Sequence, residues 1–249
     1  MTIFIIAMFL AWGSYLNSLG YRLLNLEHFF KARSFCPTCK HQIAWYDNIP
    51  VLSWLYLLAR CRSCKQTISW LYPFIELLTT CALLLLWQTI PAKYFPVYFI
   101  FFSALIVTIR TDFDKMLISR FMTLYLIPVG IVAAFIQKLS LTPTASIIGS
   151  IFGYSILWIA KKISHLITKQ DALGQGDLDL LAFIGAFTGP LGCWISLLIG
   201  STIGTLISLI YMIITKKQVT TIPFGPYLSF GAMTFVLFEK YFIQYFLGL

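Results

Sequence analysis

Apolar stretches long enough to cross a lipid bilayer recur along this chain, and they restrict its fold more than any other feature. Hydrophobic residues make up 59% of the sequence and charged residues 11%. A membrane-spanning helix needs about 20 mainly apolar residues. The sequence therefore predicts an all-α polytopic membrane protein with about eight transmembrane helices. The predicted spans are 2–19, 73–90, 94–111, 120–137, 145–160, 178–192, 194–215 and 226–246.

The distribution of basic residues predicts the orientation of these spans. With the N-terminus outside, all of the 18 Lys and Arg residues except Lys93, Lys138 and Lys240 lie on the cytoplasmic side. This asymmetry follows the positive-inside rule. The net charge of +9 is therefore explained by topology, and we expect no nucleic-acid binding. Arg22 follows the first apolar stretch as a stop-transfer charge, which favours a retained span over a cleaved signal peptide.

One sizeable polar segment, residues 22–72, interrupts the apolar spans. It is rich in Cys, Pro, Trp and basic residues, and its hydrophobic core is too small to be stable alone, so we expect a bound metal to stabilise it. The predicted domains are therefore a first transmembrane helix at 1–21, a small cytoplasmic domain at 22–72 and a seven-helix membrane domain at 73–249.

The cysteines of the 22–72 segment form two C-x-x-C pairs. Cys36 and Cys39 make the first pair, Cys61 and Cys64 the second, and 21 residues separate them. This spacing is typical of a structural zinc site with four thiolate ligands. Two disulfides or a redox pair are the alternatives, although the reducing cytoplasm argues against disulfides.

Two carboxylates stand at the predicted membrane edge on the same side. Asp112 ends the third span and Asp177 begins the sixth, so both should lie at similar depth. Ionising two neighbouring carboxylates is unfavourable, so one of them should keep its proton. That arrangement suits activation of water for attack on a peptide carbonyl. Gly174 and Gly176 would let an extended peptide backbone come close to Asp177.

Each of these features has a plainer explanation. Asp177 would serve as a helix N-cap with its glycines as hinges, and Asp112 with Asp114 would form a polar interfacial turn. The segment 221–227 contains two prolines and a glycine, which predicts a loop rather than a regular helix. That loop would either be a plain connection or line the mouth of an active site. No G-x-S-x-G, Walker A or HExxH motif competes with the carboxylates.

The ordered set of motifs resembles the type IV prepilin leader peptidases, which are membrane aspartic proteases of the GxGD type. The resemblance covers nearly the whole chain. The residues that carry it are Gly13-Ser14-Tyr15-Leu16-Asn17 with Arg22-Leu23, the two C-x-x-C pairs, Asp47-Asn48-Ile49-Pro50, Tyr72-Pro73 with Glu76, Asp112-Phe113-Asp114, Gly174-Gln175-Gly176-Asp177 and Ile222-Pro223-Phe224-Gly225-Pro226.

The resemblance implies a function and a location. Asp112 and Asp177 would be the catalytic aspartates of an endopeptidase in the bacterial inner membrane, with its active site facing the cytoplasm. Its substrates would be prepilin and pseudopilin precursors, cut after a glycine in their leader. Such proteins often also methylate the new N-terminus with S-adenosylmethionine, but no sequence fingerprint here names residues for that cofactor.

The chain departs from the family pattern at two positions. The family usually has L-P-D or I-P-N after the first aspartate, where this chain has Leu117-Ile118-Ser119-Arg120. A lysine is usual two positions after the second aspartate, where this chain has Asp179. We expect loss of that cation to raise the proton affinity of the carboxylate pair or to change how an acidic substrate residue docks.

Two functions of other classes would use some of the same features. An ion- or proton-coupled transporter would place carboxylates near the bilayer midplane within repeated halves, and neither feature is visible in the sequence. A non-enzymatic membrane assembly factor with a zinc docking domain would need the cysteines but neither aspartate.

Overall fold

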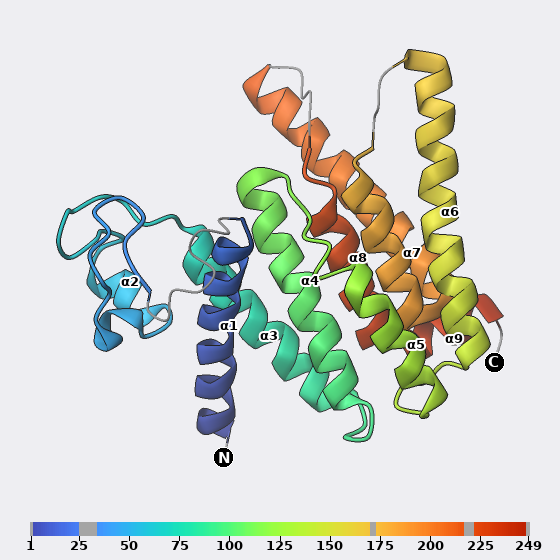
Figure 1. Cartoon of the computed structure of the whole chain (residues 1–249), viewed down its shortest axis with the longest axis horizontal. Helices are drawn as coiled ribbons and strands as arrows, with labels where there is room; N and C mark the ends of the chain where they lie inside the picture. The colour runs from blue at the N-terminus through green and yellow to red at the C-terminus, as the bar shows by residue number, and fades with distance from the viewer. Residues whose placement is uncertain (1, 25–33, 170–172, 217–221, 248–249) are drawn as a thin grey trace. The chain divides into compact units, whose positions relative to one another are not determined.

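The described part of the chain is helical and divides into two compact units. The computed structural model describes residues 2–24, 34–169, 173–216 and 222–247. The units are Met1–Gln88 and Thr89–Leu249 (Figure 1). Apart from the helices and turns, the described residues form isolated β-bridges, Phe35 with Gln42 and Arg60 with Thr67. The predicted all-α class is confirmed.

The first unit is built on two long helices. They are α1 (Thr2–Leu24) and α3 (Leu71–Thr89), and the segment between them carries the short helices η2 (Trp45–Asn48) and α2 (Leu52–Tyr56). Gly13 of α1 packs directly on α3, because a Cβ atom there would lie 2.9 Å from the Cα of Glu76. The Asn17 amide donates a hydrogen bond to the Tyr72 carbonyl at 3.0 Å. Close backbone packing and a buried polar contact thus join the two helices.

The second unit is a bundle around buried aromatic side chains. The ring of Phe101 stacks on Phe187 at 4.8 Å and contacts Phe183 at 5.1 Å between centroids. All three rings are fully buried. The helices of this unit are α4 (Phe95–Lys115), η3 (Leu124–Leu126), α5 (Ile127–Phe135), α6 (Pro143–Thr168), α7 (Gln175–Thr215), α8 (Gly225–Leu237) and α9 (Glu239–Leu247).

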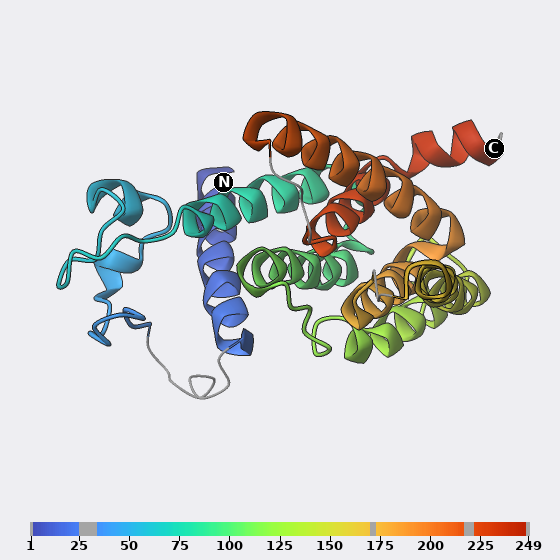
Figure 2. The same ribbon diagram turned by 90° about the horizontal axis from the view of Figure 1, so that it is seen from above.

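A sharp bend divides α7 into two arms. A straight helix of its 41 residues would be about 60 Å long, roughly twice the hydrocarbon thickness of a bilayer. Gly189 has φ 72° and ψ −176°, which is not helical, and Pro190 follows it. The Cys193 thiol lies 3.4 Å from the Leu181 carbonyl oxygen, whereas 12 residues of straight helix would place these residues about 18 Å apart. The second arm therefore turns back beside the first, and the arms then diverge (Figures 1 and 2).

The helices correspond to the eight predicted membrane segments in part, and the predicted span 226–246 is divided between α8 and α9. In the described ranges, five helices are long and apolar enough to cross a membrane by length and composition: α1, α3, α4, α6 and α7. The predicted spans 178–192 and 194–215 correspond to the two arms of α7. The predicted spans 120–137 and 226–246 contain the shorter apolar helices η3–α5 and α8. The domain division at residues 21/22 and 72/73 stays a prediction.

Replacement of Gly185 by alanine tests the packing of α6 on α7. An added Cβ atom would overlap the backbone of Gly149 and lie 2.6 Å from the Cys193 sulfur. We expect Gly185→Ala to lower the free energy of unfolding by about 1–3 kcal/mol, because the two backbones must separate. Thermal unfolding in detergent measures the change. Ser201→Ala, at an exposed position of the same helix, is the control. Equal stability of the two variants would contradict the packing.

Candidate active site and metal centre

The C-terminal end of α4 carries two aspartates, Asp112 and Asp114, in different surroundings. Asp112 is buried, with 4% of its surface exposed. The helix ends at Lys115, and the N–H of the C-cap residue Met116 donates to the Asp112 carbonyl. Asp114 is more exposed and forms an ion pair with Arg110 at 3.0 Å. The two carboxylates of this D-x-D motif therefore have different surroundings. Asp112 belongs to the interior of the bundle, and Asp114 to an ion pair within one helix.

The N-terminal end of α7 carries Asp177 in its first turn. The helix begins at Gln175, and Gly174 occupies the N-cap. The alternative prediction, that Asp177 is itself the N-cap, is therefore wrong. The Asp177 carboxyl folds back toward Gly174: its Oδ2 lies 3.3 Å from where a Gly174 Cβ would be, and the Gly174 backbone is a hydrogen-bond partner. Asp177 is half-buried, whereas Asp112 is buried.

The start of α8 holds the Asp112 carboxyl. The Gly225 N–H donates a hydrogen bond to Asp112 Oδ2 at 2.9 Å, and a Cβ atom on Gly225 would lie 2.8 Å from the same oxygen. Glycine is thus required here by close approach. The predicted loop through 221–227 is confirmed for residues 222–224 and wrong from Gly225 onward, where α8 begins; residue 221 lies outside the described residues. Pro226 is compatible with the helix because it occupies the first turn, where its missing N–H has no helical partner to lose.

The connection after α4 brings these helix ends together. Ile118 in this connection lies against Gly176, where an added Cβ would be 2.8 Å from the Ile118 Cβ. The Ile118 Cδ1 atom would lie 3.1 Å from a Cβ on Gly225. One apolar side chain therefore contacts the starts of both α7 and α8. The sequence reasoning did not identify Ile118, because a single isoleucine in a connection has no distinguishing pattern.

The two predicted catalytic aspartates meet at this junction. Asp112 comes from the end of α4 and Asp177 from the start of α7, and Ile118 contacts both Gly176, which precedes Asp177, and Gly225, which donates to Asp112. Both aspartates belong to the second unit. Paired carboxyl groups of this kind can share one proton, so that one accepts a proton from water while the other donates one. The site is thus chemically suited to hydrolysis by an activated water.

A basic residue from the connection after α4 lies beside Asp179, where the family pattern has a lysine. The Asp179 carboxyl is buried and lies 3.6 Å from the Arg120 guanidinium. A cation of this chain therefore lies beside the position where the family pattern has a lysine, and the expected effect of Asp179 on the carboxylate pair or on docking stays a prediction. Arg120 stands where the family pattern usually has an acidic or amide residue, which is why the sequence alone did not suggest the pairing.

The four predicted metal ligands come together in the first unit. The sulfur atoms of Cys36, Cys39, Cys61 and Cys64 all lie within 4.8 Å of one another, and Cys36 and Cys64 are 3.8 Å apart. Four sulfurs bound tetrahedrally to zinc at 2.3 Å would be about 3.8 Å apart. All four are free cysteines, as a site with thiolate ligands requires. The disulfide alternative would instead pair them through S–S bonds. The cluster fits a zinc ion with a closed shell of four ligands.

The backbone around the cluster repeats one turn at each C-x-x-C pair. The Lys40 N–H donates to the Cys36 carbonyl at 2.9 Å, and the Lys65 N–H donates to the Cys61 carbonyl at 3.0 Å. Lys40 and Lys65 both have positive φ, near 60°. Burial raises the pKa of Cys36, but hydrogen bonds from the Cys39 and Thr38 backbone and from the Cys39 and Cys61 side chains lower it to about 7, whereas the pKa of Cys64 is raised to about 11. A lowered thiol pKa favours the thiolate that a metal binds.

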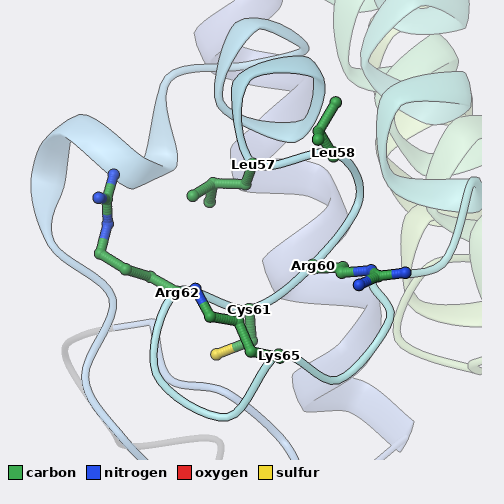
Figure 3. Close-up of a pocket in the computed structure, with 6 residues that line it drawn as sticks. All are labelled: Leu57, Leu58, Arg60, Cys61, Arg62 and Lys65. Atoms are coloured by element: carbon green, nitrogen blue, oxygen red, sulfur yellow. The ribbon is translucent and has the colours of Figure 1, made fainter.

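A pocket of about 420 Å³ opens beside Cys61 (Figure 3). Its lining combines two leucines with three basic side chains: Leu57, Leu58, Arg60, Cys61, Arg62 and Lys65. Arg62 also binds Asp47 through two hydrogen bonds, of 2.8 and 2.6 Å. Hydrogen bonding to this guanidinium lowers the pKa of Asp47. The pair fastens η2 to the second C-x-x-C turn.

Comparison with known proteins agrees with this division of the chain. Residues 7–90 match the bacterial peptidase A24 N-terminal domain, and residues 99–209 match the type IV leader peptidase family. A leader peptide-processing enzyme of type 4 prepilin-like proteins from Escherichia coli is 37% identical over 84% of this chain and 77% of its own length. The chain belongs to the type IV leader peptidase family.

Further relatives from the same family carry a two-part name. A prepilin leader peptidase/N-methyltransferase from Legionella pneumophila is 32% identical over 96% of this chain and 92% of its own length. One from Aeromonas salmonicida is 33% identical over 87% of this chain and 75% of its own. No solved structure matches the chain. Membership of a peptidase family favours an enzyme over the transporter and the assembly factor.

The family comparison and the two units divide the chain at nearly the same place. The cysteine cluster lies in the stretch that matches the N-terminal domain, whereas Asp112 and Asp177 lie in the stretch that matches the leader peptidase family. Gly225 lies beyond residue 209, the end of that match. The backbone donor to Asp112 was therefore found through the structure.

Metal analysis of the purified protein tests the cysteine cluster. We expect one zinc ion per chain, and its loss in Cys39→Ser and in Cys64→Ser, because three thiolates leave the tetrahedral shell incomplete. Cys81→Ser is the matched control, since Cys81 lies in α3 outside the cluster. Elemental analysis of detergent-solubilised protein gives the metal content. Full zinc retention in both cluster variants would rule out this site.

Proposed function

We propose that this protein is a membrane aspartic endopeptidase that removes the leader from type IV prepilins and pseudopilins, with Asp112 and Asp177 as its catalytic pair. The observation that supports the roles of these residues is that the helix ends carrying them come together around Ile118, with both aspartates in the stretch that matches the leader peptidase family. A peptidase of this type needs no metal at its catalytic centre, and the cysteine cluster belongs to the other unit.

The proposed reaction uses one water molecule and both carboxyl groups. The ionised carboxylate takes a proton from the water as its oxygen attacks the scissile carbonyl, and the other carboxyl protonates the departing amine. The N-terminal end of a helix stabilises negative charge, which favours Asp177 as the ionised partner. Asp112, held by the Gly225 N–H, would then be the proton donor. The half-buried position of Asp177 gives the water a route to it.

A glycine before Asp177 supplies the room that a peptide needs. Gly174 is exposed and has extended backbone angles, φ −71° and ψ 150°. A substrate strand would bind along the exposed Gly174, where the absence of a side chain lets its backbone reach the carboxylates, whereas Ile118 packs against Gly176. The scissile bond must leave its helix for this, since a helical peptide bond is shielded by neighbouring turns.

The proposed location follows from the helices and the charge distribution. The apolar helices make this a membrane protein, and we place it in the bacterial inner membrane with its N-terminus outside. The basic residues on the connections then face the cytoplasm, together with the ends of α4 and α7 that carry the aspartates. A prepilin has a short basic leader and an apolar helix, so its cleavage point would reach the same membrane boundary.

The second activity we propose is methylation of the new N-terminus with S-adenosylmethionine. The names of the relatives from Legionella pneumophila and Aeromonas salmonicida support it. The pocket beside Cys61 does not fit this cofactor, because its lining carries three cations and no carboxylate to face the sulfonium charge. We therefore assign no residue to the methyl donor. Zinc would stabilise the fold around the cluster, since a closed four-thiolate shell has no open position for substrate.

Alanine substitution of each aspartate tests the proposed catalytic pair. We expect Asp112→Ala and Asp177→Ala to lower cleavage of a pilin precursor by about 10²–10⁴-fold each, the usual contribution of general acid-base catalysis. The double variant should be no slower than the slower single one, because the two groups act as a unit. Cleavage is followed by the shift of the precursor on a gel.

Asp114→Asn is the matched control for these variants. Asp114 lies two residues from Asp112, in an ion pair with Arg110, and the amide retains hydrogen-bonding capacity toward that partner. We expect its cleavage rate to stay close to that of the unaltered protein. If Asp112→Ala or Asp177→Ala cleaves as fast as Asp114→Asn, the catalytic assignment fails.

Mass analysis of a mature pilin tests the proposed methylation. We expect a pilin processed by this protein to carry one methyl group on its N-terminal amine. A pilin exposed to Asp177→Ala should keep its leader and remain unmethylated, because the amine that accepts the methyl group appears only after cleavage. An N-terminal amine that is free and unmethylated after complete cleavage would remove the second activity from the proposal.

A further inference from the structure

Asp179 is a buried carboxylate at the start of α7 with partners on two sides. It is 4% exposed. One oxygen lies 3.6 Å from the Arg120 guanidinium, and the other accepts a hydrogen bond from the Gln175 amide at 3.4 Å. The same amide nitrogen lies 3.2 Å from the Tyr154 hydroxyl of α6. Burying a carboxylate is costly unless it is paired in this way. The first turns of α7 can therefore bury Asp179 only with this network in place.

The network lies on the face of α7 opposite to the catalytic carboxylate. Successive residues of a helix are about 100° apart around its axis, so Asp179 and Asp177 are separated by about 200°. Gln175 and Asp179 are four residues apart and share one face. Asp179 therefore contacts the first turn of α7 on the face opposite to Asp177. Through Asp179, Gln175, the x of the G-x-G-D motif, is linked to Arg120 in the connection after α4, and Gln175 itself contacts Tyr154 of α6.

Arg120 links this helix start to the connection that covers it. The connection also carries Ile118, which contacts Gly176 and Gly225. Gly225 is in turn the backbone donor to Asp112. The ion pair and the Ile118 contacts thus join the three chain segments that position the two aspartates. A change at Arg120 or Asp179 would move the connection relative to both helix starts.

The two departures from the family pattern occur at the two ends of this ion pair. The family's L-P-D form would place an acid at position 120. Its usual lysine, two positions after the second aspartate, would place a cation at position 179. This chain has Arg120 and Asp179, the same pair of charges in exchanged positions. We propose that Arg120–Asp179 is a polarity-reversed positioning ion pair that sets the geometry of the catalytic aspartates. This inference rests on the proposed peptidase function.

Charge-reversal variants test the pair through cleavage kinetics. Arg120→Asp and Asp179→Lys each place like charges together. We expect each to lower kcat/KM by about tenfold or more, mainly through kcat, because the aspartates are displaced while the substrate surface remains. The double variant R120D/D179K restores an ion pair with the family's polarity. We expect it to recover to within about threefold of the unaltered protein.

Neutral and conservative variants keep the test decisive if a reversed charge prevents folding. Arg120→Lys retains the charge and should retain the rate, whereas Arg120→Gln and Asp179→Asn should lower kcat without placing like charges together. Lys138→Asp, an equal change of charge at an exposed residue between α5 and α6, is the control and should cleave normally. Membrane content and thermal unfolding of each variant separate loss of protein from loss of rate.

The outcomes distinguish this inference from the proposed function. Parental kcat in Arg120→Gln and Asp179→Asn would overturn the positioning role. So would a folded double variant that is as slow as the slower single variant, because the charges would then not act on each other. If Asp112→Ala also cleaves at the parental rate, it is the proposed catalytic pair that fails.

Discussion

A carboxylate buried among apolar helices must find its partners within the protein, and the second unit is arranged around this requirement. Asp112 is satisfied by the Gly225 N–H at the start of α8. Asp179 is satisfied by Arg120 and Gln175. Asp177 uses the N-cap backbone and is the most accessible of the three acids. The carboxylates that anchor the structure are thus enclosed, and the one best placed to meet water stays partly open.

The bend in α7 makes these partnerships possible. Past Gly189 the second arm runs back beside the first and provides the surface on which α8 packs. A Cβ on Gly231 of α8 would lie 2.6 Å from the Ser196 carbonyl oxygen, and one on Gly200 would lie 3.1 Å from the Leu228 nitrogen. Because α8 lies this close to the second arm, its first N–H groups reach Asp112. A long-range hydrogen bond at the proposed catalytic site therefore depends on glycines in the bundle.

The sequence predicted those parts of the protein that have a local or periodic pattern. Apolar runs revealed the helices, C-x-x-C spacing revealed the cysteine cluster, and topology placed Asp112 and Asp177 at one depth. It failed where a partner is distant and carries no pattern of its own. The hydrogen bond to Asp112 comes from a backbone N–H, which any residue except proline has, and only the structure shows that Gly225 provides it. The segment that contains Gly225 was predicted as a loop because prolines break helices, although they are suited to a helix start.

The Arg120–Asp179 pair shows why two departures from a pattern have to be considered together. Taken alone, Asp179 removes a cation from the start of α7, and Arg120 removes an acid or an amide from the connection after α4. Relative to the L-P-D form of the pattern, the sum of the two charges is unchanged, and the ion pair can form with either polarity. Because each charge lies next to the other, reversing both changes the field at the two proposed catalytic aspartates much less than reversing one. The requirement at positions 120 and 179 is then that the two side chains carry opposite charges, whichever position carries the positive one.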